Sequence, residues 1–163
     1  MARKDILALD IGGPILKAKG GSTPAAYAAA EPTPGGFDGA SQLCHEVFDG
    51  RMFLLSQCTQ EVERVKRDWF VRHKFHELTS IQTDRLVFVR EPEEKALVCI
   101  RRGVTHFVDD RPHILRYAIG HVPHLFLFNP DPAEVELKEN SDVLRHVRIV
   151  RNWAELLGIL VPF

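Results

Sequence analysis

The fold of this chain depends on one stretch near its start, Ile6-Leu7-Ala8-Leu9-Asp10-Ile11-Gly12-Gly13. Apolar residues run directly into an aspartate here, and two glycines follow almost at once. A short apolar run bounded by turn residues is typical of a strand buried on both faces of a parallel sheet. Asp10 would then lie at the carboxyl end of the strand, where open α/β sheets bind ligands. A strand that simply ends in an Asp-Gly turn fits the same residues, so the rest of the chain has to decide.

Apolar runs of strand length alternate with segments of helical periodicity along the chain. Further strands are expected at 52–55, 86–89, 104–108, 125–128 and 147–150. Helices are expected at 37–48, 93–102 and 112–119, after an N-cap at Thr59, and from an N-cap at Asn152 to Leu160, with 75–84 as a connector. This alternation predicts an α/β fold, a three-layer Rossmann-like sandwich with a central, mainly parallel sheet.

Residues 14–36 interrupt the alternation. They contain Gly20-Gly21, an alanine-rich patch at 25–30 and prolines at 24, 32 and 34, a composition that predicts an irregular loop with one helical turn. The segment is too short to fold separately. We therefore expect residues 1–163 to form a single domain with a short loop insert at about 14–36. A loop this long in a small domain is usually functional or mobile.

Composition excludes several classes of protein. The 21 Lys+Arg nearly balance the 22 Asp+Glu, so net charge does not indicate nucleic acid or a membrane surface as a partner, although a local basic patch would still be compatible. Three cysteines without a Cys-x-x-Cys pair argue against a disulfide framework and a cysteine-rich zinc site. Neither a signal-peptide core nor an apolar run of membrane-spanning length is present, and we expect a cytoplasmic protein.

Chemically useful side chains follow or precede several predicted strands. Asp10 follows the first strand, Ser56 the second, Lys95 lies in the helix before the fourth, and Asp109 and Asp110 follow the fourth. Because the carboxyl ends of parallel strands share one edge of a sheet, these groups can converge. A nucleophilic carboxylate, a hydroxyl, a fixed cation and two further carboxylates suit phosphoryl transfer assisted by Mg²⁺.

The order and spacing of these residues resemble the haloacid dehalogenase-like (HAD) phosphohydrolase superfamily over about residues 5–128. Its lysine motif matches Lys95, and the other matching motifs are Leu9-Asp10-Ile11-Gly12-Gly13, Phe53-Leu54-Leu55-Ser56 and Thr105-His106-Phe107-Val108-Asp109-Asp110. The resemblance implies that Asp10 attacks phosphorus and becomes an aspartyl-phosphate. It further implies that Mg²⁺ is the cofactor, held by the Asp10 carboxylate, the Gly12 carbonyl and Asp109 or Asp110. The phosphate-binding residues that it implies are Ser56, Gln57 and Lys95.

One departure from the superfamily's pattern concerns the proton donor. Most of its phosphatases have a second aspartate two residues after the nucleophile, and here that position is Gly12. Histidine could donate a proton near neutral pH. His106 falls inside a predicted strand and is expected to be a core residue or a neighbour of the site, and His113 follows the acidic pair. An alternative is a catalytically weakened or inactive HAD-like domain that binds a phosphorylated partner.

The short insert in place of a larger cap also affects the expected substrate. An open site would admit a phosphorylated small molecule or the end of a macromolecule, such as a phosphoprotein or a nucleic acid, although the net charge does not indicate the latter. No membrane partner is expected.

Two other families share parts of the pattern. The residues from Leu9 to Ala18 resemble the first phosphate loop of sugar kinases with the actin-like ATPase fold. That fold needs a far longer chain and leaves Asp109-Asp110 unexplained. A response-regulator receiver also combines an acidic pair with a hydroxyl and a lysine, but its acidic pair comes early in the chain, which excludes it here.

Overall fold

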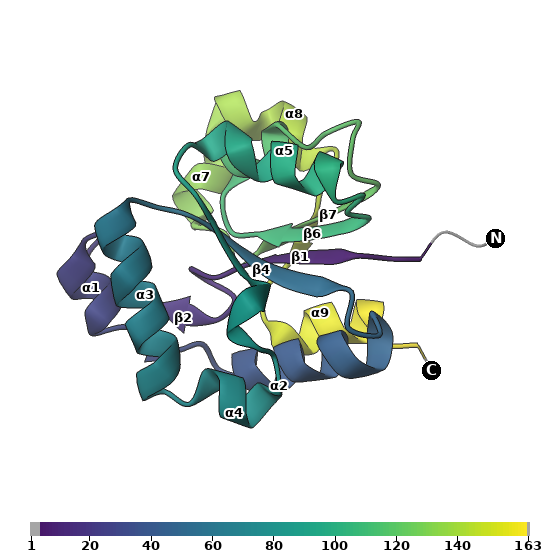
Figure 1. Cartoon of the computed structure of the whole chain (residues 1–163). Coiled ribbons are helices and arrows are strands. Elements are labelled where there is room, and N and C mark those ends of the chain that lie inside the picture. Colours follow the sequence, from purple (N-terminus) through teal and green to yellow (C-terminus); the bar gives the residue numbers. More distant parts are fainter. Residues whose placement is uncertain (1–3, 163) are drawn as a thin grey trace.

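The computed structural model describes residues 4–162, in which a six-stranded sheet lies between two layers of helices (Figure 1). All neighbouring strands of this sheet are parallel, in the order β5-β4-β1-β6-β7-β8. The strands are β1 (Leu7–Asp10), β4 (Met52–Gln57), β5 (Leu86–Val89), β6 (His106–Asp109), β7 (His124–Phe128) and β8 (Arg148–Val150). The predicted fold class is therefore confirmed.

The central position of β1 explains why its sequence is apolar without interruption. Leu7, Ala8 and Leu9 are all fully buried, because both faces of the sheet are covered. Leu7 and Leu9 pack into the core on one face, whereas Ala8 packs into the core on the other. Parallel pairing with β4 on one side and β6 on the other brings the carboxyl ends of three strands together.

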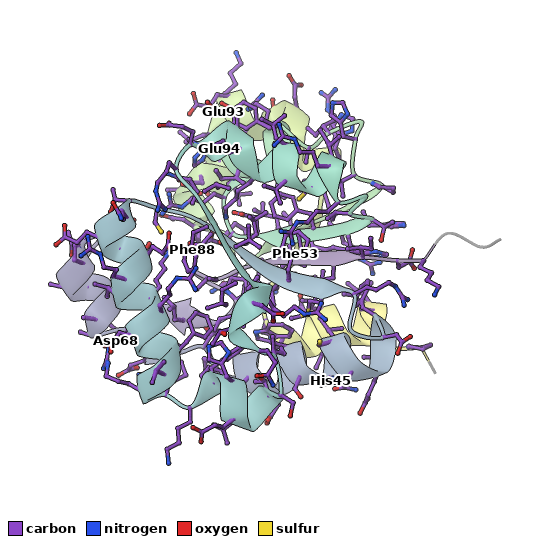
Figure 2. All side chains as sticks on the ribbon, in the orientation of Figure 1. His45, Phe53, Asp68, Phe88, Glu93 and Glu94 are labelled. Carbon is purple, nitrogen blue, oxygen red and sulfur yellow. The ribbon has the colours of Figure 1, made fainter. Side chains whose placement is uncertain are left out.

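Each face of the sheet has its own layer of helices. One layer contains α2 (Gly36–Gln42), a π-helical turn (Leu43–Val47), α3 (Gln60–Arg72), α4 (Phe75–Thr79) and α9 (Trp153–Leu160). The other contains α5 (Pro92–Arg101), α6 (Pro112–Arg116) and α8 (Ser141–Leu144), with α7 (Pro132–Glu136) packed on α8. Figure 2 shows the difference between the interior, where Phe53 lies, and the outer surface, where Glu93 and Asp68 project. Within residues 4–162, no helix combines the length and apolar character needed to cross a membrane.

The predicted helix starts are borne out by their capping contacts. The Thr59 hydroxyl accepts a hydrogen bond from the Val62 backbone at 3.2 Å, and the Asn152 side chain accepts one from Glu155 at 2.9 Å. At the start of α5, Glu91 and Glu94 form a reciprocal capping box. That box fixes the first turn of the helix that carries Lys95.

Some elements differ from the sequence-based predictions. The expected connector at 75–84 contains α4 and a 3₁₀ turn (Thr83–Arg85), because the buried Phe75 and Thr79 share one side of a short helix. The helix expected at 112–119 ends at Arg116. Two short helices and a 3₁₀ turn (Lys138–Asn140) within 132–144 were not predicted, because that charged segment shows no clear apolar period.

The insert at 14–36 is more ordered than predicted. Its expected helical turn is α1 (Pro24–Ala28), and β2 (Leu16–Lys17) pairs antiparallel with β3 (Glu31–Pro32) beside it. Strands of two residues carry no detectable sequence period, so this small sheet was missed. Figure 1 shows α1 next to α3, at the edge toward which β1 runs.

Two tryptophan side chains attach the insert to the helical layer below the sheet. The Trp153 indole donates to the Pro14 carbonyl at 2.7 Å, and the Trp69 indole donates to the Ala30 carbonyl at 2.8 Å. Both indoles are buried. The insert is thereby held near its two ends against α9 and α3.

The contact between α2 and α9 requires a glycine. A Cβ atom on Gly39 would lie 2.2 Å from Trp153 Cε3, whereas a Cβ atom on Gly158, in α9, would meet nothing within 4 Å. We expect Gly39→Ala to lower the free energy of unfolding by about 1–3 kcal/mol through overpacking. Gly158→Ala should raise it by roughly 0.5–1 kcal/mol through helix propensity. Urea unfolding of both variants measures this, and changes of the same sign would contradict the packing described.

Candidate active site

A cavity of about 650 Å³ opens at the carboxyl edge of the sheet. Its walls come from the ends of β1, β4 and β6, from the insert, and from the starts of α3 and α5. Every residue that the sequence analysis assigned to the site lines this cavity. They are Asp10, Gly12, Ser56, Gln57, Lys95, Asp109 and Asp110.

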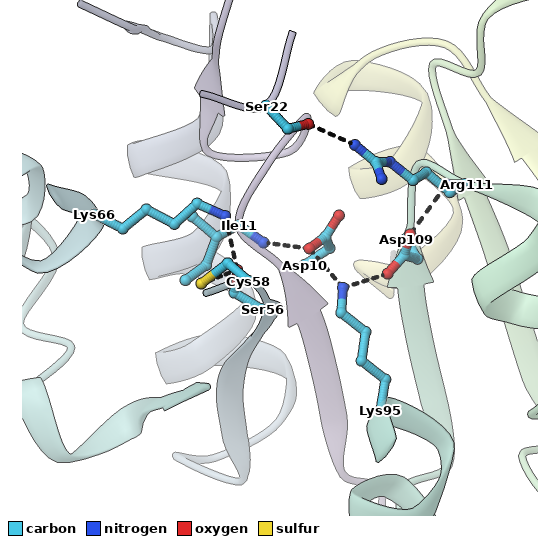
Figure 3. Close-up of polar contacts among 9 residues, drawn as sticks. All are labelled: Asp10, Ile11, Ser22, Ser56, Cys58, Lys66, Lys95, Asp109 and Arg111. Atoms are coloured by element: carbon cyan, nitrogen blue, oxygen red, sulfur yellow. Dashed lines mark hydrogen bonds and ion pairs between the residues drawn. The ribbon is translucent and has the colours of Figure 1, made fainter. Parts of the chain in front are cut away.

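Lys95 lies at the centre of the site and binds two carboxylates at once. Its Nζ donates to Asp10 Oδ1 at 2.8 Å and to Asp109 Oδ2 at 2.7 Å (Figure 3). All three side chains are buried. Burial alone would lower the pKa of Lys95, but the two carboxylates raise it above its ordinary value. Lys95 is therefore a fixed cation between β1 and β6.

Three carboxylates gather around this one lysine. Ligand oxygens of Asp10, Asp109 and Asp110 lie within 4.8 Å of one another. Burial and the charge of Asp10 raise the pKa of Asp109 to about 6, although Lys95 acts in the opposite direction. Burial and the two neighbouring carboxylates also raise the pKa of Asp110 well above its usual range. When all three carboxylates are ionised, the cluster therefore carries more negative charge than Lys95 can balance.

This donor set fits a divalent cation such as Mg²⁺. Hard cations prefer oxygen ligands, and a bound ion would offset the repulsion that raises both pKa values. Gly12, whose carbonyl is the further predicted ligand, lines the same cavity.

Backbone groups orient the carboxylates. The Ile11 N–H donates to Asp10 Oδ1 at 2.9 Å, and the Arg111 N–H donates to Asp109 Oδ1 at 3.0 Å. Gly13 has a φ of 98°, and a Cβ atom there would lie 2.9 Å from Asp110 Oδ2. A glycine is required at position 13 for both reasons. Gly12 is different, since it lacks a positive φ and a Cβ atom there would find only the Tyr27 hydroxyl, at 4.0 Å.

Lys66 is a site residue that the sequence analysis missed. Its Nζ donates to Ser56 Oγ at 2.8 Å and lies 4.3 Å from the centre of the Tyr27 ring. Only 2% of Lys66 is exposed, and no carboxylate within residues 4–162 forms an ion pair with it. The available signal was a lysine on the apolar face of α3, in helical register with Val62 and Trp69.

The Ser56 hydroxyl forms hydrogen bonds with Lys66 and, more weakly, with Cys58. Its oxygen accepts from Lys66, so its own proton is free to be donated. That proton is directed at Cys58 Sγ, 4.0 Å away, which is a weak acceptor. A phosphoryl oxygen in the cavity would be a better acceptor.

Neither histidine considered as a proton donor reaches the site. His106 begins β6 and pairs in register with Leu7, at the end of the sheet opposite to Asp109. It stacks on His124, and burial together with that neighbour lowers its pKa. His113 is exposed on α6 and does not line the cavity.

Comparison with solved structures shows the same fold in phosphatases and in dehalogenase-like hydrolases, in agreement with the fold that the resemblance implied. D,D-heptose 1,7-bisphosphate phosphatase from B. bronchiseptica, crystallised with magnesium and phosphate, matches with a TM-score of 0.64 at 12% identity, covering 96% of this chain and 98% of that chain. The enzyme of the same name from Burkholderia thailandensis matches with a TM-score of 0.56 at 13% identity, covering 98% and 100%. A dehalogenase with an intermediate complex matches with a TM-score of 0.56 at 17% identity, covering 85% and 61%. No protein-family model and no curated protein matches the sequence.

The acidic cluster predicts a stabilising effect of Mg²⁺. At a concentration about 100-fold above its Kd, the ion should raise Tm by roughly 5–10 °C, because it binds only the folded protein. Asp109→Asn/Asp110→Asn should abolish this shift, as thermal unfolding with and without Mg²⁺ would measure. The control is Glu136→Gln/Glu139→Gln, which removes two exposed carboxylates outside the cavity and should keep the shift. An equal shift in both double variants would place the ion elsewhere.

Proposed function

We propose that this protein is a magnesium-dependent phosphohydrolase or phosphotransferase that acts on phosphomonoesters through an aspartyl-phosphate on Asp10. The observation that carries the proposal is the double ion pair of Lys95. It holds the Asp10 carboxylate at the edge of a cavity, beside a cluster that fits a divalent cation.

The hydrogen bonds of Asp10 indicate which of its oxygens would react. Oδ1 accepts from both the Ile11 N–H and Lys95 Nζ. Within residues 4–162, no donor binds Oδ2, which leaves this atom available as the nucleophile. An Oδ2–P bond forms as the P–O bond to the leaving group breaks, and the leaving oxygen takes up a proton. Water or another acceptor then attacks the phosphorus and releases Asp10.

The charges around Asp10 suit this transfer. A dianionic phosphate approaching three carboxylates would be repelled unless cations intervene. Asp10, Asp109 and Asp110 would hold Mg²⁺, which when bound supplies charge neutralisation at the phosphoryl oxygens. On the opposite side of the cavity, Ser56 and Lys66 offer a hydroxyl donor and a second positive charge.

The dimensions of the cavity indicate a substrate larger than phosphate itself. Beyond the acidic cluster, its lining includes the exposed cations Lys17, Lys19 and Arg111. These favour an anionic leaving group over a neutral one. The structural neighbours named as heptose bisphosphate phosphatases are consistent with a phosphorylated small molecule. The phosphorylated end of a macromolecule is the other substrate class that we propose.

A second candidate function is the binding of a phosphorylated ligand without turnover. It is favoured by Gly12, which offers no side chain to protonate a leaving group. The same cavity, cations and acidic cluster would serve that function.

Asp10→Asn tests the enzymatic proposal. With p-nitrophenyl phosphate and Mg²⁺, this variant should lose turnover by on the order of 10³-fold or more, because an amide is a poor nucleophile. Asp38→Asn makes the same chemical change at an exposed position of α2 and should leave the rate unchanged. Equal rates for Asp10→Asn and the wild type would refute the nucleophile. Phosphate binding by an inactive wild type would favour the second candidate.

Lys66→Met separates binding from stability. A buried lysine with no carboxylate partner is costly, so methionine should leave the free energy of unfolding unchanged or raise it. The variant should nevertheless bind inorganic phosphate about 10-fold more weakly, since it loses a charge beside Ser56. Competitive inhibition and urea unfolding measure the two effects, with exposed Lys138→Met as the control. Unchanged phosphate inhibition would remove Lys66 from the site.

A further inference from the structure

We propose that the Tyr27 hydroxyl is the group that protonates the leaving oxygen, in place of the acidic side chain missing at position 12. This inference rests on the proposed phosphohydrolase function. The starting point is that the site lacks the usual proton donor, because Gly12 offers no proton and neither His106 nor His113 reaches the cavity.

The position of Tyr27 matches the missing side chain. Tyr27 lines the cavity together with Asp10 and Gly12. Its hydroxyl oxygen lies 4.0 Å from the point where a Cβ atom on Gly12 would stand, and it is the nearest atom to that point outside the adjoining residues. A side chain at position 12 would therefore extend into the space beside this hydroxyl.

The hydroxyl is also free to act. Within residues 4–162, no side chain or backbone group forms a hydrogen bond with it. Every fully buried polar side-chain atom in that range does have a partner, so the Tyr27 hydroxyl is not fully buried. Although only 9% of Tyr27 is exposed, its hydroxyl is therefore accessible from the cavity. The proton is not committed to another part of the fold.

Two hydrogen bonds from α3 hold the C-terminal end of α1, next to Tyr27. The Trp69 indole donates to the Ala30 carbonyl at 2.8 Å, and Arg72 donates to the Ala28 carbonyl at 3.1 Å. Both donors belong to α3, on which α1 packs. A proton donor needs a defined position relative to the leaving oxygen, and these contacts supply it.

Other groups that line the cavity are less suited to donate. Asp109 and Asp110 must be ionised to hold a cation. The alcohols of Ser22 and Thr59 are no stronger acids than an alkanol leaving group. Cys58 Sγ accepts from the Ser56 hydroxyl, and burial raises the pKa of its thiol. A phenol is a stronger acid than an alkanol, so it can give its proton to an alkoxide leaving group.

The proton transfer balances over the two half-reactions. As Asp10 Oδ2 attacks phosphorus, the electron pair of the broken P–O bond passes to the leaving oxygen, which takes the Tyr27 proton. The tyrosinate that remains lies beside the Lys66 ammonium group, 4.3 Å from the ring centre. In the second half-reaction a water molecule attacks phosphorus and gives its proton to the tyrosinate, while the P–O bond to Asp10 breaks.

Tyr27→Phe is tested with aryl and alkyl phosphates, because proton donation helps poor leaving groups most. In single-turnover measurements, release of p-nitrophenolate should stay within about 3-fold of the wild type, whereas release of glycerol from glycerol phosphate should fall by about 10²-fold or more. The control is Tyr117→Phe, an exposed tyrosine outside the cavity, which should change neither rate. If the ratio of the alkyl rate to the aryl rate is the same in Tyr27→Phe as in the wild type, the assignment of Tyr27 as the proton donor is overturned.

Gly12→Asp provides a second test, made both in the wild-type and in the Tyr27→Phe background. A Cβ atom at position 12 meets no atom closer than 4.0 Å, and Gly12 is not among the residues with a positive φ. Because a donor is already present in the wild-type background, Gly12→Asp should raise alkyl turnover far less there than in the Tyr27→Phe background. In the Tyr27→Phe background it should restore most of the lost rate. A gain of about 10²-fold in the wild-type background would show that Tyr27 does not donate.

The outcomes also separate this inference from the proposed function. If the wild type turns over no phosphomonoester, or Asp10→Asn is as active as the wild type, both fail. If turnover depends on Asp10 while the alkyl-to-aryl ratio is indifferent to Tyr27, only the assignment of the proton donor fails.

Discussion

The structure depends on one buried cation shared by two carboxylates. Removing a lysine from water is costly, and the cost is recovered only when the charge is paired at close range. Lys95 meets that condition twice, through Asp10 and Asp109, and so links α5 to the carboxyl ends of β1 and β6. Because Asp110 adds a third carboxylate, pairing is incomplete. The remaining negative charge is what makes the cluster suitable for a divalent cation.

On the other side of the cavity, a buried charge that can attract an anionic ligand reduces the stability of the fold. Lys66 is buried against the Tyr27 ring and Ser56, with no carboxylate partner among the described residues. A buried charge without a counterion reduces stability, and such arrangements are typical of sites that bind an oppositely charged ligand. The core around it offsets this cost. Trp69 and Trp153 hold the insert in place while they fill the layer below the sheet.

Several features of the structure lay outside the sequence-based expectations, each for a physical reason. The helix α4 and the small β2–β3 sheet are too short for periodicity to register, and they form because neighbouring parts of the fold bury them. The two histidines were considered as donors because they are close in sequence to Asp109. In the structure, His106 is separated from it by the length of β6, and His113 is exposed and does not line the cavity.

The sequence by itself determined the sheet, and it placed Asp10, Ser56, Lys95 and the Asp109-Asp110 pair at one edge. Burial on both faces forces parallel strands to be continuously apolar, so the polar residue at the end of each run is conspicuous. Only the tertiary structure decided that Lys66 and Tyr27 join this site. A periodic pattern shows which face of a helix is buried, but not which residue of another element lies against it. Lys66 and Tyr27 meet because α1 packs on α3, a contact between two elements that neither local sequence specifies.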